Sequence, residues 1–210
     1  MARTQAGTRT TAGTRTSLPN PIILSDTFSS NTLSNYTNST VVNGTWVIGS
    51  GILTQSVAGS GAGWAAGVLL TNGSSYTNFD LYCDIQKPAG NIQVVFRSGI
   101  TANSGYGLQI RDTANLRIEN WGQTNLIQTT NPHGLANWST SQWYTIHVHI
   151  QGNYIQASIY LQGTTEPTTY DLNFYNSLFS TGSIGFSVEN GAGGNFDNLI
   201  VLNLNRRFQA

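Results

Sequence analysis

The chain has 210 residues, of which 9% are charged and 39% are hydrophobic, and its formal net charge is zero. The scarcity of charged helix formers and the 23 glycines argue against a helical fold, while the aromatic content of 10% argues against a disordered chain. The single cysteine, Cys83, excludes an internal disulfide framework, and no apolar run is long enough to predict a membrane span.

Residues 1–20 differ in composition from the rest of the chain. They contain Arg3, Arg9 and Arg15 and no acid, in a segment rich in Thr and Gly. Because such a segment favours neither a helix nor a packed core, we expect an extended basic arm that binds a partner. Arginines without interleaved aromatic residues argue against nucleic acid as that partner. The segment lacks the apolar stretch of a secretory signal peptide, so we expect synthesis in the cytoplasm.

Residues 21–210 predict one β-sandwich domain. Short alternating runs, broken by Gly, Asn and Ser, recur along this part of the chain. We expect about twelve strands, at residues 22–28, 45–49, 52–56, 64–71, 78–86, 91–98, 105–111, 115–120, 142–151, 154–161, 183–189 and 196–204. Residues 171–179 are expected to form a loop or one helical turn. The fold class is therefore all-β, an antiparallel jelly-roll β-sandwich.

The alternation assigns side chains to two faces. Ile92, Val94 and Phe96 are expected in the core, with Gln93 and Arg97 on the opposite face. The same reasoning extends this opposite face to further polar residues: Gln109, Arg111, Arg117, Glu119, His147 and His149. One polar sheet face rich in Arg, Gln and His is therefore predicted.

Short motifs along residues 22–204 resemble the concanavalin A-like lectin/glucanase superfamily, in particular its laminin-G-like jelly rolls. The motifs that carry this resemblance are Asp26-Thr27-Phe28, Asn78-Phe79-Asp80-Leu81, Val94-Val95-Phe96-Arg97, Gly105-Tyr106-Gly107-Leu108, Trp143-Tyr144-Thr145-Ile146, Gly152-Asn153-Tyr154-Ile155, Gly182-Ser183-Ile184-Gly185-Phe186 and Phe196-Asp197-Asn198. The resemblance implies a jelly-roll fold. It leaves the function open, because this fold is shared by lectins, hydrolases and structural modules.

Hydrolase chemistry is not expected. Glucanases of this superfamily carry a Glu-x-Asp-x-x-Glu strand, and the chain has no such run. Glu119, Glu166 and Glu189 stand isolated in the sequence, whereas glycoside cleavage needs a pair of neighbouring carboxylates. We therefore expect no enzyme activity.

The sequence gives only weak support for two candidate metal sites. His147 and His149 share a strand face and could begin a site, but no third ligand follows nearby, so an exposed polar face is the favoured interpretation. Related jelly rolls hold a structural calcium where the first and last strands pair, which makes Asp26 and Asp197 candidates. The alternative, favoured for both acids, is that they cap turns or bind backbone N–H groups. No other cofactor is expected.

Two functions remain open. The favoured one is a virion structural protein, a phage capsid decoration (cement) protein on the virion surface. It would dock through its arm on the major capsid protein or another virion protein, as a homo-oligomer and most simply a trimer. The alternative is a carbohydrate-binding, lectin-like module that recognises host glycans. Its candidate binding residues are Arg97, Arg111, Trp121, Trp138, His147 and His149.

Overall fold

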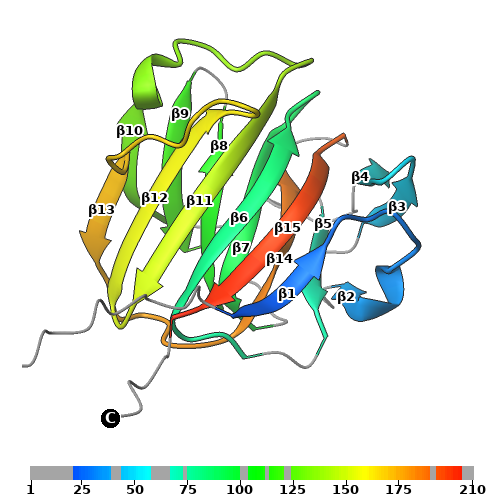
Figure 1. Cartoon of the computed structure of the whole chain (residues 1–210), viewed down its shortest axis with the longest axis horizontal. Helices are drawn as coiled ribbons and strands as arrows, with labels where there is room; N and C mark the ends of the chain where they lie inside the picture. Colours follow the sequence, from blue (N-terminus) through cyan, green and yellow to red (C-terminus); the bar gives the residue numbers. More distant parts are fainter. Residues whose placement is uncertain are drawn as a thin grey trace, which may run out of the picture.

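The computed structural model describes residues 21–38, 44–57, 67–72, 75–99, 104–111, 114–120, 124–189 and 193–204. Over these residues the predicted all-β fold is confirmed, because two antiparallel sheets pack face to face (Figure 1). The described part contains only two 3-10 turns besides strands, η1 (Leu33–Asn35) and η2 (Pro132–Gly134). The predicted arm, with Arg3, Arg9 and Arg15, lies outside the described residues.

Sheet A has eight strands and contains the first and the last strand of the sandwich. Its strand order is β13-β12-β11-β6-β15-β4-β3, and β1 also pairs with β15. The strands are β1 (Ile22–Asp26), β3 (Thr45–Gly49), β4 (Ile52–Val57), β6 (Phe79–Gln86), β11 (Trp143–Gln151), β12 (Tyr154–Leu161), β13 (Leu172–Tyr175) and β15 (Asn195–Asn203). The expected pairing of the first and last strands is therefore confirmed.

Sheet B has seven strands in the order β10-β9-β8-β7-β14-β5-β2, and it lies behind sheet A in Figure 1. Its strands are β2 (Tyr36–Asn38), β5 (Gly67–Thr71), β7 (Asn91–Ser98), β8 (Tyr106–Ile110), β9 (Asn115–Asn120), β10 (Thr124–Thr130) and β14 (Ser183–Glu189). The core between the sheets is formed by the apolar side chains of the alternating runs, among them Ile92, Val94 and Phe96 of β7.

The described strands outnumber the predicted twelve by three, which are β2, β10 and β13. β2 has three residues and β13 has four, so neither is long enough to show an alternating pattern. Strand β13 begins inside the stretch 171–179, which was predicted to be a loop or a helical turn. Strand β10, at the edge of sheet B, has no fully buried residue and therefore lacks the alternation of a half-buried strand.

Arg97 does not lie on the polar face that the alternation predicts. Its backbone has a φ of 47°, in the left-handed region, at the point where the pairing of β7 with β14 becomes irregular. The alternation is broken there, and the side chain is only 1% exposed. Its guanidinium donates hydrogen bonds to three backbone carbonyls from separate segments, those of Thr77, Gly152 and Phe179. Arg97 therefore ties segments of the sandwich together rather than facing a ligand.

Arg97→Met should destabilise the protein by about 2–4 kcal/mol, because partly buried carbonyls lose a charged donor. The matched control is Arg111→Met, at a half-buried arginine just after β8, which should change the free energy of unfolding by less than about 1 kcal/mol. Urea denaturation followed by circular dichroism measures both. Equal midpoints for the two variants would contradict the structural role of Arg97.

Candidate functional site

The side chains of sheet B that point away from the core form a buried polar network. Alternation puts Gln93 on this face of β7, Gln109 on β8 and Arg117 on β9. The strand register places these three in one row, since Gln93 pairs with Gln109 and Gln109 pairs with Arg117. Ser187 of β14 extends the row by pairing with Gln93. We call these four residues, together with Glu119 and Glu189, the polar network.

Two carboxylates flank the row, one on each side of it. Glu119 lies two residues beyond Arg117 on β9, and Glu189 lies two residues beyond Ser187 on β14. Gln109 bridges them, because its Nε2 lies 3.5 Å from a carboxylate oxygen of Glu119 and 2.6 Å from one of Glu189. The acids that are isolated in the sequence therefore converge in the fold.

The remaining contacts occupy every carboxylate oxygen of the pair. Gln93 Nε2 donates to Ser187 Oγ and to Glu189 Oε1, both at 3.2 Å. Arg117 donates from Nε to Gln109 Oε1 at 2.6 Å, and its Nη2 forms an ion pair with Glu119 Oε2. Gln93 Oε1 is buried and accepts no hydrogen bond. The network therefore contains one acceptor, Gln93 Oε1, that has no hydrogen-bond donor.

Burial controls the electrostatics of this face. Glu189 and Gln109 are 0% exposed, and Arg117, at 9%, is the most accessible member. Burial, reinforced by repulsion from Glu119, raises the pKa of Glu189 to about 7. Burial also lowers the pKa of Arg117, although the neighbouring Glu119 opposes this shift. Solvent reaches the network chiefly at Arg117, while its amide and carboxyl groups are buried.

The candidate glycan residues predicted from the sequence do not form one face. Strands β7, β8 and β9 belong to sheet B, whereas His147 and His149 lie on the outer face of sheet A, so the prediction of a single polar face is wrong. Arg111 lies near Arg117 at the end of β8. Trp138 packs edge-on against Tyr144, with ring centroids 5.3 Å apart, beside the core. Trp121 is outside the described part of the chain.

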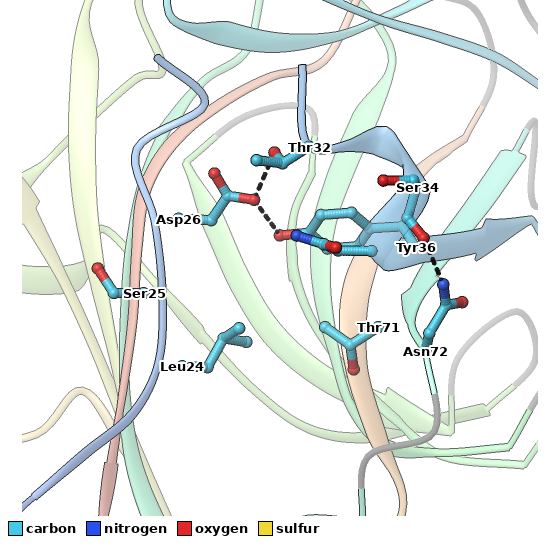
Figure 2. A pocket seen from close by; sticks show the side chains of 9 residues that line it. Leu24, Ser25, Asp26, Thr32, Ser34, Tyr36, Thr71 and Asn72 are labelled. Carbon is cyan, nitrogen blue, oxygen red and sulfur yellow. Dashed lines mark hydrogen bonds between the residues drawn. The ribbon is translucent and has the colours of Figure 1, made fainter. Parts of the chain in front are cut away.

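Asp26 lies at a separate hollow of about 310 Å³ near the edge of sheet B (Figure 2). Its carboxylate accepts hydrogen bonds from Phe28 N at 2.8 Å, Thr32 Oγ1 at 2.7 Å and Tyr36 Oη at 3.0 Å. Asp197 accepts one from Asn198 N at 2.6 Å. Both acids therefore bind backbone N–H groups, as the alternative interpretation predicts, and within the described ranges neither belongs to a cluster of three or more His, Cys, Asp or Glu side chains that could share a metal ion.

Sequence reasoning placed most of the network on one face but missed the carboxylate pair. Gln93, Gln109, Arg117 and Glu119 follow from alternation along consecutive strands. Glu189 does not, because β14 reaches β7 from a distant part of the chain. The signal that could have found it is the run Ser183–Glu189, where Ser187 and Glu189 alternate with apolar residues.

Comparisons with known proteins agree with this architecture. A family model described as the 3-keto-alpha-glucoside-1,2-lyase-like domain matches residues 24–202. A search of curated proteins found no match.

Three solved structures illustrate the likeness in fold. The carbohydrate-binding module CBM66 from Bacillus subtilis has 18% identity and a TM-score of 0.63, over 80% of this chain and 96% of that chain. The exoplasmic/lumenal domain of VIP36, in its Ca²⁺/Man2-bound form, has 10% identity and a TM-score of 0.62, over 88% and 89%. SCLam, a non-specific endo-beta-1,3(4)-glucanase from family GH16, has 12% identity and a TM-score of 0.58, over 88% and 91%. These likenesses support the concanavalin A-like sandwich expected from the sequence.

Glu189→Gln should change how stability depends on pH. In the wild-type protein the folded state holds the Glu189 proton up to about pH 7, whereas the unfolded state releases it near the ordinary value of 4.5. The stability that this carboxyl contributes is therefore present at acidic pH and is lost as the pH rises through about 7. The variant lacks this loss, so its stability relative to wild type should increase from pH 5 to pH 8. Urea denaturation across that range measures the difference, and parallel pH curves would contradict it.

Proposed function

Because the chain belongs to the 3-keto-alpha-glucoside-1,2-lyase-like domain family, we propose that it binds carbohydrate through the polar network of sheet B. The observation that carries this proposal is the row of planar side chains, Gln93, Gln109 and Arg117, between two carboxylates. Sugar hydroxyls donate and accept hydrogen bonds at once, so neighbouring amide, guanidinium and carboxylate groups are suitable partners.

Burial favours binding at this face in two ways. Hydrogen bonds are stronger where water is excluded, and an unpaired buried acceptor such as Gln93 Oε1 is stabilised by any hydroxyl that reaches it. The charges of Arg117 and Glu119 offset each other, and Glu189 is only half ionised near its pKa of about 7, so the network carries little net charge at neutral pH. A neutral saccharide is therefore the ligand class that the network suits.

The proposed activity is binding of a saccharide without hydrolysis. Glycoside hydrolysis requires one carboxyl to protonate the leaving group and a second carboxylate to act as a nucleophile or base. Here all four carboxylate oxygens of the pair are already engaged by Gln93, Gln109 or Arg117. In this proposal the carboxylates act as hydrogen-bond acceptors within the binding face and not as catalytic groups.

The virion decoration role stays a prediction, together with its trimer, its capsid partner and its virion-surface location. It depends on residues 1–20, which the described ranges do not include. Carbohydrate binding and a place in a larger assembly are compatible, because the polar network is on the body of the protein.

A glycan array probed with the full chain should identify a neutral oligosaccharide ligand, and calorimetry should then measure its affinity. Gln109→Ala and Gln93→Ala should each weaken binding by roughly tenfold, the loss expected for one buried hydrogen bond. Reducing-sugar release from the same ligand should stay at background.

The matched control is Gln156→Ala, on the outer face of sheet A, which should bind as wild type does. Circular dichroism confirms that each variant is folded. Unchanged affinity in both network variants, or no array signal from folded protein, would overturn the proposal.

A further inference from the structure

A cluster of histidine and carboxylate side chains lies on the outer face of sheet A. Asp80 is on β6, and His147 and His149 are on the neighbouring strand β11. His149 pairs directly with Asp80, and His147 lies two residues away on the same face, next to Tyr82. This face is on the opposite side of the sandwich from the polar network. The third ligand that the sequence did not show next to His147 and His149 is therefore supplied by strand pairing.

The three side chains direct one ligand atom each to a common point. Asp80 Oδ1 lies 2.6 Å from His149 Nδ1 and 3.1 Å from His147 Nε2. All three atoms lie within 4.8 Å of one another. Atoms that share a tetrahedral zinc ion at about 2.0–2.2 Å lie about 3.3–3.6 Å apart. The two contacts of Asp80 Oδ1 with the histidine nitrogens are shorter than this, so these atoms have to move apart by roughly 0.2–1 Å to admit the ion.

His147 is held between two carboxylates. Its Nε2 faces Asp80, and its Nδ1 lies 2.5 Å from Glu166 Oε1. A neutral imidazole carries one N–H, so it satisfies only one of these acceptors. A metal ion at Nε2 satisfies Asp80 while Nδ1–H donates to Glu166, which is the carboxylate–histidine arrangement typical of metal sites.

The surroundings of the cluster support an accessible but ordered site. His147 is buried, with Tyr82 stacked on its ring at 4.2 Å between centroids, and Tyr170 contacts both histidines. The side chain of His149 is 22% exposed, so one side of the cluster faces solvent.

We propose that Asp80, His147 and His149 bind one Zn²⁺ ion, with Glu166 positioning His147. Two imidazoles and one carboxylate suit zinc, whereas calcium and magnesium prefer oxygen ligands. Three protein ligands leave a fourth position open toward solvent, where water or an external donor binds. The site is independent of the carbohydrate-binding face.

The test is calorimetric titration of the full chain with ZnCl₂ after removal of metals with a chelator. Wild type should bind one ion per chain, and Zn²⁺ should raise the thermal unfolding temperature. His149→Ala, at the more exposed ligand, should abolish this saturable binding. Glu166→Gln should keep binding but weaken it by about 10–100-fold, the loss typical of a positioning carboxylate.

The control is His133→Ala, because His133 is the third histidine of the chain and pairs with Asp171 instead. It should bind Zn²⁺ as wild type does. Visible absorption with Co²⁺ in place of Zn²⁺ should show tetrahedral coordination in wild type and not in His149→Ala. Absence of saturable binding in wild type, or full binding in a folded His149→Ala variant, would overturn the proposal.

Discussion

Burying Glu119 and Glu189 on one face of a sheet is unfavourable unless compensating donors stand beside them, and the structure of sheet B supplies those donors. Arg117 neutralises Glu119, and Gln109 bridges the two acids from the strand between them. These contacts require β9, β8, β7 and β14 to be adjacent in one register. The same requirement fixes the row of planar side chains from which the binding function is inferred.

The two outer faces of the sandwich carry different kinds of polar side chain, because the outward-facing residues of each sheet come from different strands. Sheet B gathers amides, Arg117 and two carboxylates, while sheet A gathers His147, His149 and Asp80. Arg97 marks the limit of the alternation, because its left-handed backbone brings its guanidinium to three carbonyls from other segments. Alternation therefore predicts the face on which a polar side chain lies only where the strand keeps its regular pleat.

Local patterns predicted the fold better than they predicted the sites. Alternation and turn residues were sufficient for the all-β sandwich and for the polar side of β7, β8 and β9. Pairing between distant strands was not predictable in the same way. Glu189 joins Gln109 because β14 lies beside β7, and Asp80 joins His149 because β6 lies beside β11. The irregular backbone at Arg97 was likewise not predictable, since arginine is not a residue type that favours a positive φ.

The most direct test of carbohydrate binding by sheet B is an NMR titration that follows side-chain amide groups. The Nε2–H₂ signals of Gln93 and Gln109, assigned by mutation, are recorded as a neutral oligosaccharide ligand is added. The account predicts that both signals shift together and saturate at one ligand per chain, while the signal of Gln156 on sheet A stays in place. Shifts confined to Gln156 and its neighbours, with Gln93 and Gln109 unmoved at saturation, would contradict it.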